Sequence, residues 1–222
     1  MSKMETLDPQ ELDLEAGREL VRVARESIEM KLNGRKGEIE IKNPLLRRRG
    51  MGFVTLETFY GDTTELRGCI GYLRPVAEIW KVIAQAAIGA AQGDPRFPPL
   101  KRNELDYVII EVTVLSQPSQ IRTKDPWELP KLVKVGRDGV LVERDPWYSG
   151  VLLPQVGTEN KWDSQTLLAE TCMKAGLSPE CWLDRRNRIS TFTAAIFRER
   201  KPKGEVFKVE LSQSEGDLMR KV

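Results

Sequence analysis

The sequence contains no histidine among its 222 residues. Catalytic triads and Cys-His dyads use an imidazole as general base, so neither can form within this chain. The same absence excludes zinc and iron sites that use histidine ligands. Acid–base or nucleophilic chemistry must therefore come from Cys, Asp, Glu, Lys, Arg, Tyr or backbone groups.

Cysteine is scarce, with only Cys69, Cys172 and Cys181 present. No pair has CxxC spacing, which argues against zinc fingers and thioredoxin-like motifs, and the spacing does not support a Cys₃ metal site either. We therefore predict no metal site. An odd count indicates a reducing compartment, although a Cys172–Cys181 bridge stays open for a hyperthermophilic source. The position of Cys172 at helical spacing from Leu168 and Ala175 favours core packing.

Neither an excess of one charge nor a long hydrophobic run is present. The 35 basic and 33 acidic residues give a net charge of +2, which provides little attraction to nucleic acid or to an anionic membrane. The longest apolar stretch, "IAQAAIGAAQG", is too short to span a bilayer, and the acidic N-terminus does not resemble a signal peptide. We therefore expect a soluble, cytoplasmic protein without membrane contact.

Capping residues and hydrophobic periodicity predict three helices. The first begins after Asp8, buries Leu20, Ala24 and Ile28, and stops at Asn33-Gly34. The second begins at Pro75 and is apolar on most sides, and the third runs from the N-cap Asp163 to about residue 175.

Runs of β-branched and aromatic residues predict the strands. They form a hairpin of 52–59 with 65–73, a central strand over 106–116, a hairpin around 137–139, a strand ending at Pro154, and late strands in "STFTAAIFRER" and "EVFKVEL". Because helices and hairpins are interleaved without regular βαβ alternation, we predict an α+β fold. The last ten residues are expected to form a loose tail.

The stretch "TELRGCIGYL" contains a cysteine between two glycines. Strand alternation places Arg67, Cys69 and Gly71 on one face, and Leu66, Gly68, Ile70 and Tyr72 on the other, core-facing side. A nearby guanidinium favours thiolate, and glycine allows close approach of a ligand or another backbone. This pattern is typical of a reactive cysteine, but also of a small residue that packs well, and both interpretations remain open.

Two further segments carry candidate functional side chains. Asp94 and Arg96 lie in the proline-rich loop "GDPRFPPL", where they bind substrate or form a local salt bridge that fixes the turn. Gln155 and Glu159 follow a strand end, and without histidine a carboxylate such as Glu159 is the natural general base. The alternative for Glu159 is an ordinary acid of a solvent-facing loop.

The motif "LRGCIG", with "FVTL" before it, "DPRFPPL" after it and the later runs "LLPQV" and "CMKAGL", resembles the AMMECR family. The resemblance covers most of the chain and implies one AMMECR-type domain over 1–222, with an approximate core of 8–201. It also implies an antiparallel or mixed sheet with a larger and a smaller subdomain. The motif itself falls on Leu66 to Gly71, which includes Arg67, Gly68 and Cys69.

The resemblance gives a functional context rather than an activity, because the family has no established reaction or cofactor. Its members occur beside Memo-like and radical-SAM proteins, which implies a shared pathway in nucleotide or RNA-base modification. We predict catalytic roles for Cys69 and Glu159, and substrate binding by Arg67, Gly68, Gly71, Asp94, Arg96 and Gln155. The alternative is a non-catalytic module that binds a protein partner. The short basic clusters at 47–49 and 185–188 are interpreted as solvated surface, and RNA contact as a minority hypothesis.

Overall fold

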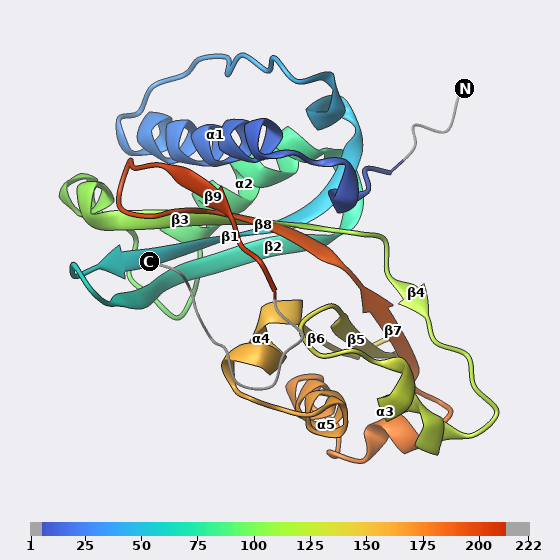
Figure 1. Cartoon of the computed structure of the whole chain (residues 1–222). Coiled ribbons are helices and arrows are strands. Elements are labelled where there is room, and N and C mark those ends of the chain that lie inside the picture. Colours follow the sequence, from blue (N-terminus) through green and yellow to red (C-terminus); the bar gives the residue numbers. More distant parts are fainter. Residues whose placement is uncertain (1–5, 212–222) are drawn as a thin grey trace. The chain divides into compact units, whose positions relative to one another are not determined.

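The computed structural model describes residues 6–211, which include all the helices and strands reported below (Figure 1). The chain divides into two compact units. The first combines the chain up to Ser116 with Ala195–Val209, and the second contains Gln117–Ala194. Each unit has its own antiparallel sheet, packed helices and apolar core, which confirms the predicted α+β class.

The first unit is built on a five-stranded sheet with the order β2-β1-β3-β8-β9. Strands β1 and β2 form the predicted hairpin, and β3 lies in the middle of the sheet with every residue buried. The strands are β1 (Arg49–Phe59), β2 (Thr64–Glu78), β3 (Val108–Leu115), β8 (Ala194–Glu199) and β9 (Val206–Lys208). The segment "STFTAAIFRER", predicted as one late strand, forms two strands. Its second part is β8 in this sheet, and its first part belongs to β7 (Arg188–Phe192) in the other sheet.

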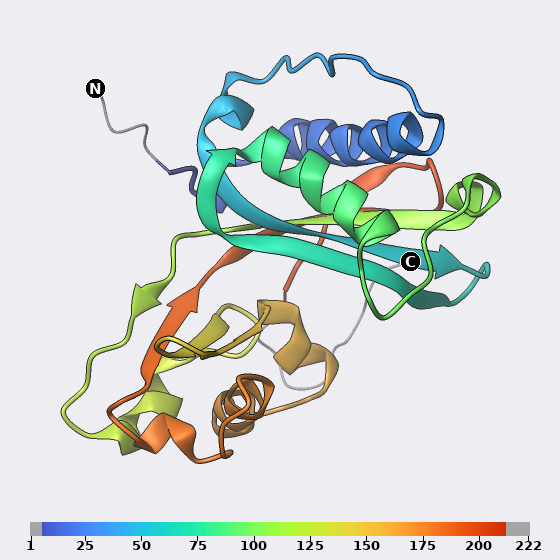
Figure 2. The same cartoon turned by 180° about the vertical axis from the view of Figure 1, so that it is seen from behind.

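Helices α1 (Leu14–Leu32) and α2 (Ile79–Gln92) lie side by side against one face of this sheet, as both views show (Figures 1 and 2). The predicted capping box at Asp8 exists, but it caps a short 3₁₀ helix, η1 (Pro9–Glu11). Helix α1 has its own N-cap in Asp13, whose carboxylate accepts the amide of Ala16. The predicted start of α2 at Pro75 is wrong, because β2 continues to Glu78 opposite Arg49.

Two more 3₁₀ helices complete the first unit, η2 (Pro44–Arg47) before β1 and η3 (Arg102–Tyr107) before β3. The side chains of Leu20, Ala24 and Ile28 are fully buried, as their four-residue spacing predicts. None of the helices in the described part of the chain combines the length and the apolar character needed to cross a membrane.

The second unit has a four-stranded sheet with the order β4-β7-β5-β6. Its strands are β4 (Ser119–Gln120), β5 (Gly139–Arg144), β6 (Tyr148–Leu152) and β7 (Arg188–Phe192). Its helices are η4 (Pro126–Glu128), α3 (Leu129–Leu132), α4 (Pro154–Glu159), α5 (Ser164–Lys174) and η5 (Cys181–Leu183). Asp163 caps α5 as predicted, and Gly176 follows its end with a φ of 77°.

The predicted hairpin around 137–139 is wrong. Strand β5 pairs instead with β6 and β7, while the residues before it form α3 and a turn. Asp138 determines this turn, because its buried carboxylate accepts the amide of Lys134 at 2.9 Å and the guanidinium of Arg137 at 2.6 Å. The expected C-terminal tail lies outside the described residues, apart from the short segment that ends at residue 211.

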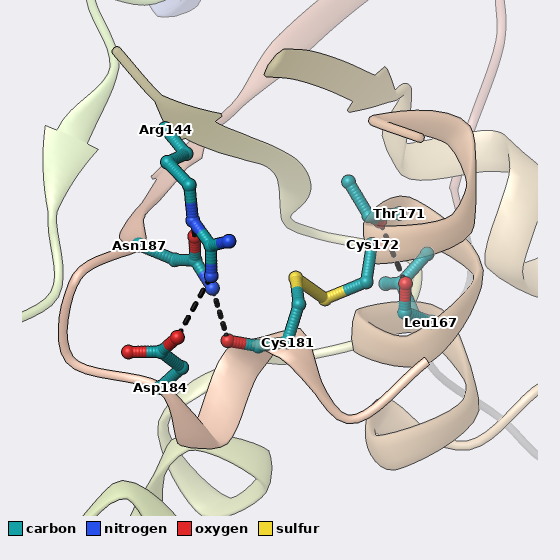
Figure 3. Close-up of a disulfide and its surroundings, with 7 residues drawn as sticks. All are labelled: Arg144, Leu167, Thr171, Cys172, Cys181, Asp184 and Asn187. Carbon is teal, nitrogen blue, oxygen red and sulfur yellow. Dashed lines mark hydrogen bonds and ion pairs between the residues drawn. A yellow bond between two sulfur atoms is a disulfide. The ribbon is translucent and has the colours of Figure 1, made fainter. Parts of the chain in front are cut away.

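A disulfide joins Cys172 of α5 to Cys181 of η5 (Figure 3). Both residues lie in the apolar core of the second unit, so Cys172 packs there as predicted and is also covalently paired. The Cys181 carbonyl accepts a hydrogen bond from the side-chain amide nitrogen of Asn187. The side-chain oxygen of Asn187 accepts a second hydrogen bond, from Arg144 Nε at 2.7 Å. Two of the three cysteines are thus consumed, which excludes a Cys₃ metal site.

Candidate functional site at Cys69

Cys69 lies in a row of polar side chains that crosses three strands of the first sheet. On β2 it faces Thr55 of β1, which in turn faces Glu111 of β3. Directly paired residues of antiparallel strands point to the same face with Cβ atoms about 4.5–5.5 Å apart. The three side chains therefore line the face opposite to the apolar row Ile70, Val54 and Val112, which packs in the core with α1 and α2.

The thiol of Cys69 accepts a hydrogen bond from the Thr55 hydroxyl, with an Sγ–Oγ1 distance of 3.4 Å. Burial raises the pKa of the thiol above its ordinary value, and the carboxylates of Glu111 and Asp94 act in the same direction. The Thr55 hydrogen bond and the Arg96 guanidinium oppose this rise in pKa without overcoming it. The raised pKa favours the protonated thiol at neutral pH, whereas a reactive cysteine needs its thiolate.

The backbone of Cys69 is held by the proline-rich loop. Its amide donates to Asp94 Oδ2 at 2.8 Å, and its carbonyl accepts Arg96 Nη2 at 3.3 Å. Asp94 and Arg96 also form a bidentate pair, with Nε–Oδ1 and Nη2–Oδ2 distances of 3.0 and 2.7 Å. Since β2 is an edge strand, the pair satisfies backbone groups that would otherwise be open to another chain. The local salt bridge considered for this loop is thus present.

The charge state of Asp94 follows from these contacts. The Arg96 guanidinium, helped by the amides of Cys69 and Arg96, lowers the pKa of the Asp94 carboxyl far below its usual range, although burial opposes the shift. Such a carboxylate stays ionised and is a poor proton acceptor, so Asp94 positions the strand rather than acting as a base.

Arg67 is placed differently from the prediction, because a β-bulge interrupts the strand. Leu56 pairs with Gly68 but Glu57 pairs with Leu66, so Arg67 is the extra residue between them. The Arg67 guanidinium binds Glu104 of η3 at 3.1 Å. The arginine that lowers the pKa of the Cys69 thiol is therefore Arg96, and not Arg67 as the sequence suggested. Arg67 Nη1 is buried without a recorded partner within residues 6–211.

The bulge also reverses the strand alternation beyond it. Leu66 shares the face of Glu57 and Thr55 instead of the helix-covered face, and it is 44% exposed. The prediction that Leu66 faces the core is therefore wrong, whereas Ile70 packs against the core as expected.

Both glycines of the motif are required by close packing. A Cβ atom at Gly68 would lie 2.2 Å from the carbonyl oxygen of Ala90 in α2. At Gly71 it would lie 2.2 Å from the ring of Phe53 on β1. The close approach anticipated from the sequence is thus made by a helix backbone and an aromatic ring.

Gln155 and Glu159 follow the end of β6, as expected, and both belong to α4 in the second unit, so the loop considered as the alternative for Glu159 is a short helix. Gln155 Oε1 is buried without a recorded partner within residues 6–211. The unit that contains Cys69 has its own carboxylates near the thiol, and the proposed roles of Gln155 and Glu159 stay predictions.

Three charged residues were missed by sequence reasoning: Glu111 in the Cys69 row, and Arg198 and Glu57 next to it. Arg198 of β8 contacts Glu111 at 3.3 Å and also binds Glu57 of β1, and all three side chains are buried or nearly so. The available signal was Glu111 itself, the one charged residue in the mainly apolar strand Val108–Leu115. Buried charges are kept only when paired, and here the pairing crosses strands far apart in sequence.

No group of three or more Cys, Asp or Glu side chains in the described part of the chain is arranged to hold a metal ion. The Cys69 row offers one thiol, one hydroxyl and one carboxylate, Glu111, which is already paired with Arg198. This donor set suits proton transfer and hydrogen bonding to an organic substrate.

Three proteins of similar sequence have names that state no activity. A protein of Sulfurisphaera tokodaii is 50% identical over 210 residues, covering 92% of this chain and 91% of its own length. A Saccharolobus islandicus protein is 50% identical over 196 residues, covering 88% of this chain and 86% of its own length. The crystal structure of an uncharacterised Pyrococcus horikoshii protein is similar with a TM-score of 0.83 and 45% identity, covering 90% of this chain and 99% of that one.

The sequence profile of the AMMECR1 family matches residues 21–197, a range that contains the "LRGCIG" motif and both sheets except β9 and the last two residues of β8. The resemblance found in the sequence is thereby confirmed, and the chain belongs to the AMMECR1 family.

Proposed function

We propose that the protein is an enzyme that uses the Cys69 thiol to donate a proton to a substrate atom on which negative charge develops. The hydrogen bond from Thr55 to Cys69 Sγ supports this most directly, since it stabilises the thiolate that remains after donation. Burial and the nearby carboxylates keep the proton on sulfur beforehand, and Arg96 stabilises the anion afterwards. A general acid needs both properties.

The step balances without a redox partner. A water molecule that adds to the substrate places an electron pair on a ring carbon or nitrogen. The S–H bond then breaks with its electron pair left on sulfur, and the proton bonds to that substrate atom. Cys69 is half-buried rather than sealed, so water can return a proton to the thiolate. The nucleophile role predicted from the sequence needs the thiol to lose its proton before or during attack, and the raised pKa of the thiol disfavours that loss.

The substrate class that we propose is a nucleotide or an RNA base, within a pathway shared with Memo-like and radical-SAM proteins. Ring atoms of nucleobases develop negative charge during addition and exchange reactions, which is the charge that a thiol proton neutralises. Arg96 is half exposed and uses Nε and Nη2 for Asp94, which leaves Nη1 for a substrate anion. Glu159 and Gln155 have no part in this scheme.

The test compares a deletion strain with strains that carry Cys69→Ser or Cys69→Ala, by metabolite and tRNA-modification profiling. A serine hydroxyl is a far weaker acid than a thiol, so both substitutions should reproduce the deletion profile. The thermal midpoint of unfolding checks that each variant folds. It should stay close to that of the parent, because the Cys69 contacts with Asp94 and Arg96 use the backbone and not the side chain. A deletion defect that both variants restore would contradict the proposal.

A second function, a non-catalytic module that binds a protein partner, is favoured by one observation. The glycines and the Cys69 backbone in the motif are all engaged in packing or in the Asp94–Arg96 contact. Under this alternative, Cys69→Ser leaves cell function intact, and substitutions of exposed apolar residues such as Leu66 and Val76 abolish it.

A further inference from the structure

The first unit contains a cavity of about 670 Å³ on its helical side, remote in the fold from the polar face that carries Cys69. Its walls are α1, α2, the end of η2 at Arg47 and the segment between α1 and η2. That segment, mid-blue in Figure 1, leaves the end of α1 and returns along its length. Small-molecule sites in proteins have volumes of about 300–1,000 Å³, so the cavity is large enough for an organic ligand.

The wall-forming segment is tied to α1 at both of its ends. The amide of Arg35 donates to the Met30 carbonyl at 2.9 Å. Further along, the amides of Lys42 and Asn43 donate to the Glu19 carboxylate at 2.6 and 3.0 Å. The cavity is therefore built by specific contacts rather than by a loosely placed loop.

The lining is strongly basic although the whole chain is nearly neutral. Five cations and one carboxylate, Glu38, line the cavity, whereas the net charge of the chain is only +2. Lys81 is paired with Glu78 at 2.6 Å, but Lys31, Arg35 and Lys36 have no recorded ion pair within residues 6–211. The five cations are Lys31, Arg35, Lys36, Arg47 and Lys81.

The cations lie near the two ends of an apolar floor. Trp80 and Lys81 are in the first turn of α2, and Ile88 is about 12 Å further along the helix axis at the usual rise per residue. Met30, Ile39 and Ile41 contribute apolar surface between α1 and α2. The N-terminus of α2 has no side-chain cap, which adds a positive helix-dipole end near Lys81.

We propose that this cavity binds a nucleoside polyphosphate, with its phosphates at the basic side chains and its base and sugar over the apolar floor. An inorganic anion would leave the floor unused, and an uncharged aromatic molecule would leave the cations unused. The lining has five cations and a single carboxylate, Glu38, so its side chains neutralise the phosphates and we propose that binding needs no metal ion.

Binding is measured by calorimetric titration of the full chain with ATP, GTP, CTP and UTP in EDTA, each up to about 1 mM. At least one nucleotide should bind with one-to-one stoichiometry and at least tenfold more tightly than inorganic tripolyphosphate. Affinity should fall as salt is raised, since exposed charges are screened. Failure of all four to bind saturably would overturn the proposal, as would tripolyphosphate binding equally well.

The matched variants are Arg35→Glu/Lys36→Glu in the cavity and Arg74→Glu/Arg122→Glu outside it. All four side chains are exposed and both double variants change the net charge equally. The cavity variant should lose at least tenfold in affinity and the control less than threefold. Equal losses would assign the effect to overall charge and contradict the site. Cys69→Ser should bind nucleotide normally, so failure here and failure of the thiol chemistry are distinguishable.

Discussion

The backbone amide of Cys69 donates a hydrogen bond to the buried carboxylate of Asp94, at 2.8 Å. The loop that follows α2 is thereby fastened to the edge strand β2 at the centre of the "LRGCIG" motif. The same carboxylate holds Arg96, so one side chain organises both the strand edge and the guanidinium nearest the thiol.

Asp94→Ala should lower the free energy of unfolding by about 2–4 kcal/mol, because it leaves the Cys69 amide without its acceptor and removes the partner of Arg96. Asp94→Asn keeps a side-chain acceptor and should cost less. Urea unfolding of the three proteins measures both values. Equal stability of Asp94→Ala and the parent would contradict this account of the loop.

The contribution of Asp94 should depend on pH in one direction. The folded-state pKa lies well below that of the unfolded chain, so folding binds fewer protons and stability rises with pH. The stability advantage over Asp94→Asn should be complete above the ordinary aspartate pKa of about 3.9 and shrink as pH falls below it. Unfolding at pH 6, 4 and 3 tests this, and a constant difference would contradict it.

The thiol of Cys69 can be titrated without interference from other thiols, because the other two cysteines are disulfide-bonded, and Cys69→Ser supplies the tyrosine background. Its thiolate absorbance should appear above the ordinary thiol range, and iodoacetamide should label it more slowly than free cysteine at pH 7.5. Arg96→Met should raise the pKa further, since Arg96 favours the thiolate, whereas Arg67→Met should leave it unchanged. A pKa below that of free cysteine would restore the nucleophile interpretation.

Much of the first unit could be predicted from local sequence patterns. The four-residue spacing of Leu20, Ala24 and Ile28 and the turn between β1 and β2 each depend on neighbouring residues only. The Cys69–Thr55–Glu111 row could not be predicted, since it requires β1 to lie between β2 and β3. The bulge at Arg67 is also invisible in sequence, although one extra residue exchanges the faces of the strand.

Gly68→Ala should destabilise the protein by about 1–3 kcal/mol, because its Cβ would overlap the carbonyl of Ala90 and force the helix and strand apart. Gly37→Ala is the control, since its nearest neighbour is the flexible end of Met30 at 3.2 Å. The control should change stability by about 0.5 kcal/mol or less. Thermal unfolding compares the two, and a harmless Gly68→Ala would show that the motif does not need this glycine for packing.

Removal of the disulfide should destabilise the fold through the second unit. The bridge joins residues nine positions apart, and a loop of this size contributes about 2–3 kcal/mol in the chain-entropy description. Cys172→Ala/Cys181→Ala should therefore unfold at lower denaturant concentration than the parent, and reductant should shift only the parent. Thiol counting in non-reducing denaturant should give one free thiol, and three would contradict the bridge.

The buried ion pair of Arg25 in α1 with Glu199 in β8 should be the most costly charge to break. The Arg25 guanidinium also donates to the carbonyls of Leu105 and Val108, and Glu199 accepts the Ile110 amide at 2.9 Å. Glu199→Ala leaves a desolvated cation and should lower the free energy of unfolding by about 3–5 kcal/mol.

The exposed pair of Glu15 and Arg18 supplies the control for this prediction. Glu15→Ala should cost about 0.5 kcal/mol or less, because solvent screens that pair. The double variant Arg25→Met/Glu199→Leu should recover most of the loss of Glu199→Ala, since an apolar pair leaves no buried charge unpaired. Chemical denaturation of the four proteins measures the series. If Glu199→Ala were as mild as Glu15→Ala, the pair would not be the internal tie between helix and sheet that its burial indicates.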